Sequence, residues 1–208
     1  MPRTIDYVFS LASPWAYLGF DLFHAAAAKH GATIRYRPVS LGEVFSETGG
    51  LPLAKRHPVR QGYRLVELQR WRAARNVKLN VHPKFWPLDP SLADKVAAAL
   101  ADAGRSPESY LRHAHRAIWA EDRNMADEAT IAEVIRAAGE NPATLEAAKG
   151  EGAAATYAAN RDWAIAHGAF GSPGYMLDGE FFWGQDRIEL LEAALASRRA
   201  PYLPGVEN

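Results

Sequence analysis

The sequence predicts an α/β protein in which both ends of the chain form a small β-sheet and the middle forms helices. Strand-like patterns occur at residues 4–11, 33–38 and 174–183. Residues 40–167 show helical periodicity and almost no strand signal. The expected order is therefore βαβ, a helical block, and ββα, which is typical of a sheet domain interrupted by a helical insertion.

The first end of the chain predicts a strand, a helix and a second strand. Thr4–Leu11 reads TIDYVFSL, and its β-branched and aromatic residues favour a strand. A helix is expected to begin at Ser13 and Pro14 and to run to about His30, because Ser is a favoured N-cap and Pro suits the first helical position. Thr33–Pro38 alternates like a strand, so the two strands should be parallel with a crossover helix between them.

Five helices are predicted in the middle of the chain, each with apolar residues at helical spacing. They are expected to end near Asn76, Gly104, Ala120, Gly139 and Gly168. A proline-rich loop with two aromatic residues, PKFWPLDP, occupies residues 83–90. We expect residues 41–168 to form a helical insertion, and residues 1–40 and 169–208 to form the sheet domain together.

The last part of the chain predicts a hairpin followed by a helix. Asp178 and Gly179 are a strong two-residue turn signal between the expected strands Gly174–Leu177 and Glu180–Trp183. The final helix is predicted from three apolar residues on one face: Ile188, Leu191 and Leu195.

Composition excludes several classes of function. The 208 residues include 24 Lys and Arg and 24 Asp and Glu, so the net charge is zero, and without a basic tract we expect no nucleic-acid partner. No apolar run is long enough for a membrane span, and no secretory signal is visible at Met1–Thr4, so we expect a cytoplasmic protein that acts on a small molecule.

The absence of cysteine excludes disulfides, thiolate metal sites and dithiol redox chemistry. No His pair has the spacing of a helical zinc site, so no metal is expected.

The tetrapeptide Ser13-Pro14-Trp15-Ala16 lies where the first strand meets the first helix. In thioredoxin-like proteins a Cys-x-x-Cys motif occupies this place, and the helix N-terminus stabilises its first thiolate. With Ser first and Ala last, dithiol exchange is impossible. The Ser13 hydroxyl can instead donate a hydrogen bond to the thiolate of a bound ligand and favour its ionisation. Alternatively, Ser13 only caps the helix.

Two later segments suggest where such a ligand binds. A cis peptide between Ser172 and Pro173 would expose the Ser172 backbone N–H and C=O to a peptide-like ligand opposite the first helix, although an ordinary trans loop proline is the alternative. The run Trp183–Asp186 joins a strand end to a helix start and is suited to an anion. There Asp186 can accept a hydrogen bond from an ammonium, as in a γ-glutamyl group, or it only caps the helix.

Across essentially its whole length the chain resembles the 2-hydroxychromene-2-carboxylate isomerases, which are related to the kappa-class glutathione transferases. The resemblance is strongest in VFSLASPWAYLGF, LQRW, HPKFWPLDPSLADK, AIWAEDRNMAD and DGEFFWGQDRIELLE. It implies a DsbA-like thioredoxin fold with a helical insertion, usually in a homodimer, that binds glutathione as a cofactor.

The resemblance also implies roles for individual residues. Ser13 matches the catalytic serine beside the glutathione sulfur. The glutathione-binding positions are Ser13, Ser172, Trp183, Gly184, Gln185 and Asp186. Lys55 corresponds to a basic residue near the organic substrate. The pocket for that substrate is expected to be lined by Trp15, Phe85 and Trp86. The chain departs from the family at Ser172-Pro173-Gly174, where Val-Pro-Thr is usual, and this changes the wall of the pocket.

The activity implied is a glutathione-dependent cis–trans isomerisation in aromatic compound catabolism. A thiolate would add reversibly to 2-hydroxychromene-2-carboxylate or a similar conjugated acid, allow rotation about the resulting single bond, and then be eliminated. A kappa-like transferase or peroxidase that consumes glutathione is the alternative. A non-catalytic binding module is a third possibility, but such a module has no need of a thiolate-stabilising hydroxyl.

Overall fold

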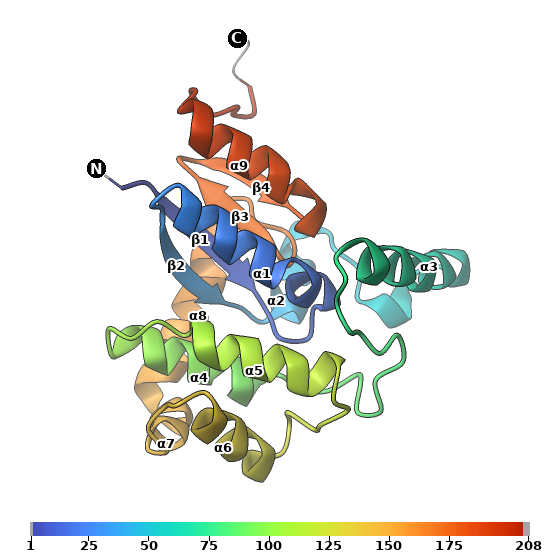
Figure 1. The fold of residues 1–208 in the computed structure, drawn as a ribbon, viewed down its shortest axis with the longest axis vertical. Coiled ribbons are helices and arrows are strands. Elements are labelled where there is room, and N and C mark those ends of the chain that lie inside the picture. The colour runs from blue at the N-terminus through green and yellow to red at the C-terminus, as the bar shows by residue number, and fades with distance from the viewer. Residues whose placement is uncertain (1, 206–208) are drawn as a thin grey trace.

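In the computed structural model, which describes residues 2–205, a four-stranded sheet is covered by helices on both faces (Figure 1). The strand order is β2-β1-β3-β4. Strand β1 (Thr4–Phe9) is parallel to β2 (Thr33–Pro38) and antiparallel to β3 (Gly174–Leu177), which forms a hairpin with β4 (Glu180–Trp183). The predicted parallel pair, the hairpin and the βαβ…ββα order are confirmed.

The first strand is shorter than predicted, because it ends at Phe9 rather than at Leu11. Beyond Phe9 the backbone amides bond to distant side chains and no longer to a neighbouring strand. The Ser10 amide donates to Oγ of Ser172 at 3.1 Å, and the Leu11 amide donates to the Asp94 carboxylate at 2.9 Å. The chain therefore leaves the sheet and turns into the first helix.

Helix α1 (Pro14–Lys29) is the predicted crossover between β1 and β2. The remaining helices are α2 (Leu41–Thr48), η1 (Leu53–Lys55), α3 (Pro58–Ala74), α4 (Ser91–Asp102), α5 (Glu108–Trp119), α6 (Glu128–Ala137), α7 (Thr144–Lys149), α8 (Glu151–Ala166), η2 (Gln185–Arg187) and α9 (Ile188–Ser197). The five predicted middle helices correspond to α3, α4, α5, α6 and α8. Helices α2 and α7 were not predicted, because each is short and buries only one or two side chains.

The two faces of the sheet carry different partners, as strand alternation requires. Tyr7 and Phe9 of β1 belong to the main hydrophobic core together with residues of α1 and α9. Val8 points to the opposite face, where it packs with Val44 of α2 and Ala164 of α8.

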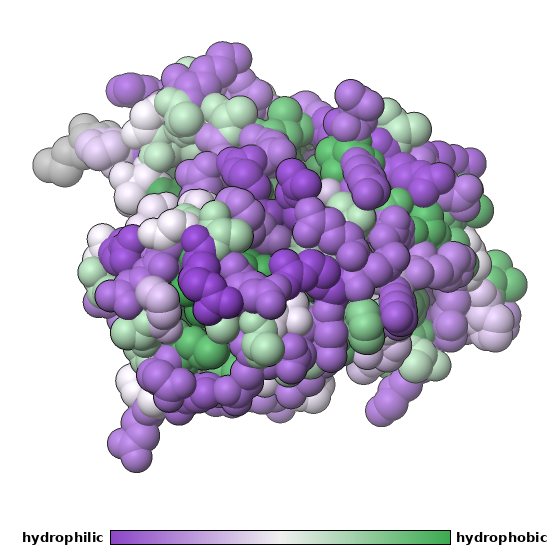
Figure 2. Space-filling model, turned by 60° about the horizontal axis from the view of Figure 1, so that its bottom comes forward, coloured by the Kyte–Doolittle hydropathy of each residue, from purple (hydrophilic) through white to green (hydrophobic). Residues whose placement is uncertain are grey.

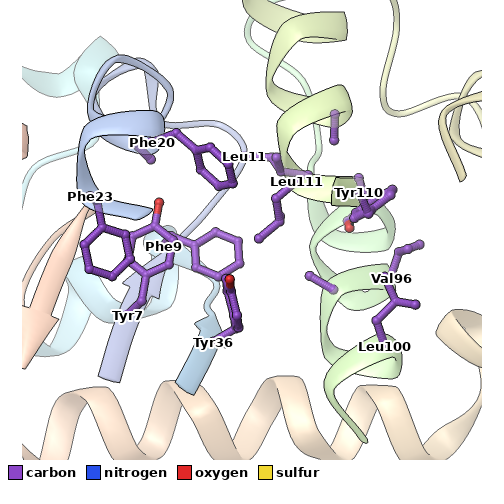
Figure 3. Packing of buried hydrophobic residues seen from close by; sticks show 14 of the residues in the cluster. Tyr7, Phe9, Leu11, Phe20, Phe23, Tyr36, Val96, Leu100, Tyr110 and Leu111 are labelled. Carbon is purple, nitrogen blue, oxygen red and sulfur yellow. The ribbon is translucent and has the colours of Figure 1, made fainter. Parts of the chain in front are cut away.

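The main core is continuous from the sheet into the helical block. Figure 3 shows Tyr7, Phe9 and Phe23 on one side, with Leu11 and Leu111 lying toward the middle. The labelled residues on the other side are Val96, Leu100 and Tyr110 of α4 and α5. One core thus contains residues of both predicted domains, and the proposed limits at 40/41 and 168/169 stay a prediction.

The surface seen in Figure 2 is mainly hydrophilic, and its apolar residues form small, separate patches. Across residues 2–205, no helix combines the length and the hydropathy that crossing a membrane requires.

Candidate functional site

Ser13 is buried at the start of α1 and makes two hydrogen bonds through its hydroxyl. Its Oγ accepts from the Ala16 amide at 3.3 Å, which is the predicted helix cap. The hydroxyl also donates to the backbone carbonyl of Ser172 at 2.9 Å. The side chain therefore caps the helix and also joins it to the loop before β3.

The Ser172–Pro173 peptide is cis, so the alternative of an ordinary trans loop proline is wrong. The Ser172 carbonyl faces α1, where it accepts from Ser13, and its Oγ accepts from the Ser10 amide. Within residues 2–205 the Ser172 N–H has no protein acceptor. The backbone of Ser172 thus offers an unused donor and a carbonyl side by side, which is the arrangement that pairs with an extended peptide.

Trp183 and Gly184 lie directly beside this cis peptide. The Gly184 amide donates to the Pro173 carbonyl at 2.9 Å. The half-exposed Trp183 ring covers Gly171, where an added Cβ would come within 2.4 Å of the indole nitrogen. The structure therefore brings this predicted binding run against the loop that contacts Ser13.

Gln185 and Asp186 have different environments. Gln185 is buried, and the Arg75 guanidinium at the end of α3 donates to its side-chain oxygen at 3.0 Å and to its carbonyl at 3.2 Å. Asp186 is exposed, pairs with Arg187 at 2.5 Å and makes no capping hydrogen bond, so the alternative interpretation of Asp186 as a cap is wrong. Arg75 was not predicted from the sequence, because its partners lie 110 residues away.

Of the four predicted substrate-binding residues, two lie near Ser13. Trp15 is half-buried against the cluster formed around Leu68 of α3. Trp86 is half-buried, and its indole N–H donates to the Ala12 carbonyl at 3.4 Å. Both indoles therefore flank the loop that carries Ser13.

Lys55 and Phe85 are not brought to Ser13 by any contact in the described part of the chain. Lys55 is exposed in η1, and its side chain makes no hydrogen bond or ion pair there. Phe85 is also exposed, and its ring lies 5.1 Å from the ammonium of Lys84.

The helical block supplies the groups that fix the loop before Ser13. The buried Asp94 carboxylate of α4 accepts from the Ser10 hydroxyl at 2.7 Å and from the Leu11 amide at 2.9 Å. The Trp119 indole of α5 donates to the Leu11 carbonyl at 3.0 Å. These side chains supply hydrogen-bond partners for buried polar groups of a loop that pairs with no strand. The hydrogen bonds fix the position of the loop.

Asp94 was not singled out from the sequence, although one signal was present. It is an acidic residue inside the apolar, alanine-rich helix SLADKVAAALAD. Burial raises the pKa of its carboxyl to about 7, and the hydrogen bonds from Leu11, Ser10 and Tyr157 oppose that rise. A titratable group with a pKa near neutrality thus lies directly behind the Ser13 loop.

Two features elsewhere in the described part of the chain bear on the choice of site. Among residues 2–205, no cluster of His, Asp and Glu side chains is placed to hold a metal ion. A hollow of about 570 Å³ is lined by residues that include His24, Tyr36 and Arg105, and it contains none of the predicted site residues. The candidate site therefore rests on the contacts around Ser13 and Ser172.

Comparison with known proteins gives consistent matches over almost the whole chain. The profile of the DSBA-like thioredoxin domain matches residues 4–196. A 2-hydroxychromene-2-carboxylate isomerase of Sphingobium xenophagum is 28% identical over 198 residues, which are 94% of this chain and 99% of that protein. Glutathione S-transferase kappa 1 of Caenorhabditis elegans is 28% identical over 92% of this chain and 89% of its own length.

A solved structure of 2-hydroxychromene-2-carboxylate isomerase has a TM-score of 0.76 and 25% sequence identity. The match covers 94% of this chain and 95% of that one. These comparisons confirm the DsbA-like thioredoxin fold and the resemblance to both groups of enzymes.

Replacement of Asp94 by Asn is expected to change how stability depends on pH. The folded protein raises the Asp94 pKa from 3.8 to about 7, so the folded state holds this proton more tightly than the unfolded state does. The contribution of the Asp94 carboxyl to the free energy of unfolding is therefore highest below about pH 4, falls between about pH 4 and 7, and then stays constant. The full change is on the order of 4 kcal/mol.

Chemical unfolding of the wild type and of Asp94→Asn at pH 5, 6, 7 and 8 measures this effect. The variant should gain stability relative to the wild type as the pH rises to 7. Asp162→Asn, which changes an exposed carboxylate on α8, is the matched control and should follow the wild type. An Asp94→Asn variant with the wild-type pH profile would contradict the assignment.

Proposed function

The chain belongs to the DSBA-like thioredoxin domain family, and from that premise we propose that it is a glutathione-dependent cis–trans isomerase. The substrate class proposed is 2-hydroxychromene-2-carboxylate or a similar conjugated aromatic acid. The main support for this function is that a buried serine hydroxyl lies at the N-terminus of α1 in a chain that has no cysteine. The reactive thiol must then come from a ligand.

The Ser172 backbone and the run Trp183–Asp186 are proposed to hold glutathione. The unused N–H and the carbonyl of Ser172 suit the peptide groups of glutathione. The exposed Asp186 carboxylate is proposed to accept from the ligand's ammonium, while Gln185, fixed by Arg75, keeps this run in place. When bound, glutathione would supply a thiolate for reversible addition to the conjugated substrate.

Ser13 has to redirect its hydroxyl proton to act on that thiolate. The hydroxyl has one proton, which it donates to the Ser172 carbonyl. A ligand amide N–H that donates to the same carbonyl compensates for the loss of this bond. Ligand binding therefore frees the Ser13 hydroxyl to donate its hydrogen bond to the sulfur. The Ala16 amide keeps Oγ in position meanwhile, and the positive end of α1 favours the anion.

The substrate is proposed to lie beside the indoles of Trp15 and Trp86, with Phe85 at the exposed edge. Lys55 is proposed to attract the substrate carboxylate or to stabilise the negative charge that develops on the substrate. Enclosing an aromatic acid between indoles excludes water and holds the electrophile in one orientation.

A direct assay separates this function from its alternative. The absorbance of 2-hydroxychromene-2-carboxylate is followed with enzyme, with and without catalytic amounts of glutathione. Conversion that requires glutathione and conserves its thiol is the expected result. Net loss of thiol would favour a kappa-like transferase or peroxidase, which the similarity to the kappa transferase supports as the second candidate. No conversion with or without glutathione would contradict the isomerase, and loss of free thiol with a general electrophile would then favour the transferase.

Replacement of Ser13 by Ala is expected to lower kcat about 10²- to 10³-fold, because it removes one donor aimed at the developing anion. Its effect on the KM for glutathione should be smaller, since the proposed backbone contacts of Ser172 remain. Ser197→Ala removes a hydroxyl whose one hydrogen bond within residues 2–205 goes to the Ala193 carbonyl on α9, and this control should keep wild-type kinetics. An Ser13→Ala enzyme with unchanged kcat would refute the role given to Ser13.

We also propose a cytoplasmic homodimer. Three apolar side chains, Val59, Tyr63 and Val66, are exposed along one side of α3, at spacings of four and three residues. Light scattering should then give twice the chain mass of 22.9 kDa. A mass of one chain at micromolar concentration would contradict the dimer.

A further inference from the structure

Arg64 of α3 is a half-buried cation without a partner. Its guanidinium carbon lies 5.0 Å from the centre of the Trp86 ring, and its nitrogens make no hydrogen bond or ion pair with any residue in 2–205. Burial and the positive charge of Arg56 together lower the pKa of Arg64 to about 10. No carboxylate offsets either effect.

The other arginines of α3 either have a partner or are exposed. Arg70 pairs with Glu67 at 2.5 Å, and Arg72 donates to the Leu79 carbonyl at 3.1 Å. Arg75, the residue that follows the helix, pairs with Glu189 at 2.9 Å. Arg60 also lacks a side-chain partner, but it is exposed, so water solvates it. Arg64 differs because it has lost part of its hydration without gaining an acceptor, and that is unfavourable for a charged group.

The position of Arg64 connects it with the candidate site. Its guanidinium lies over the Trp86 ring, and the Trp86 indole donates to the Ala12 carbonyl, which directly precedes Ser13. A cation–π contact of this kind holds the guanidinium near the ring and leaves its N–H groups available to an acceptor. An anion bound there would lie next to the proposed substrate indoles and would also relieve the repulsion between Arg64 and Arg56.

We propose that Arg64 binds the carboxylate of the aromatic acid substrate and makes the site selective for anionic over neutral electrophiles. A guanidinium matches a carboxylate through two parallel hydrogen bonds, which would satisfy the donors that the protein leaves unpaired. Lys55, which is exposed and held by no side-chain contact within residues 2–205, then keeps the second role proposed for it, stabilisation of the negative charge that develops on the substrate. The inference rests on the proposed function for the identity of the substrate, but the binding site itself can be tested without turnover.

The test compares the binding of cinnamate, an unreactive aromatic carboxylate, with that of its neutral analogue cinnamamide. Binding is followed by tryptophan fluorescence in the wild type, Arg64→Gln, Arg64→Lys and Arg60→Gln. We expect the wild type to bind cinnamate more tightly than cinnamamide. Arg64→Gln should weaken cinnamate binding about 10- to 100-fold, as expected for lost hydrogen bonds to a charged group, and leave cinnamamide unchanged.

Arg64→Lys should fall between the wild type and Arg64→Gln, and Arg60→Gln should match the wild type. Because Arg64 has no hydrogen-bonded or ionic partner within residues 2–205 and loses only its contact with the Trp86 ring, Arg64→Gln should unfold close to the wild-type temperature. Equal binding of cinnamate by the wild type and Arg64→Gln, or no preference of the wild type for cinnamate, would overturn the inference. A negative isomerase assay with the expected cinnamate result would instead reject the proposed function and keep the Arg64 site.

Discussion

The hydrogen bond from the Ser13 hydroxyl to the Ser172 carbonyl is the interaction around which the candidate site is organised. It joins residues that are 159 positions apart, one at the start of α1 and one in the loop before β3. The sheet makes this contact possible, because β1 and β3 are neighbours and deliver both loops to the same edge. The reciprocal bond from the Ser10 amide to the Ser172 side chain fixes the distance between the two loops.

The helical block takes part in this arrangement rather than only covering the sheet. The loop between β1 and α1 has no strand to pair with, and three residues of the block supply its polar partners: Asp94, Trp119 and Trp86. A loop held in this way keeps the Ser13 oxygen in place before any ligand arrives, so that only the hydroxyl proton has to turn toward the sulfur. The same block also carries Arg64, so the groups proposed for thiol and substrate meet where the two parts of the chain join.

Features set by local sequence were predicted well, and features set by distant contacts were not. The crossover helix, the hairpin at Asp178 and the N-cap at Ser13 follow from short patterns, and the structure has all three. The early end of β1 was missed, because it depends on Ser172 and Asp94, which lie far along the chain.

The polar residues behind the site were missed for the same reason. Arg75 and Arg64 look like ordinary helix residues in the sequence, and Asp94 differs only in being an acid within an alanine-rich helix. The importance of all three lies in which neighbours they gain or lack after folding. Resemblance to a family pointed to Lys55 and Phe85, but the structure shows no contact that links either side chain to Ser13. Their roles remain predictions.

The thiol pKa of bound glutathione tests the central claim most directly, because it reports on the hydrogen bond that Ser13 is proposed to donate. Thiolate absorbance in the ultraviolet, followed against pH, gives this value for the wild type and for Ser13→Ala. The wild type should hold the pKa of the bound thiol at least about one unit below the free thiol value of about 8.5. The variant should return the pKa toward that of the free thiol. Equal pKa values in the two proteins would contradict the account.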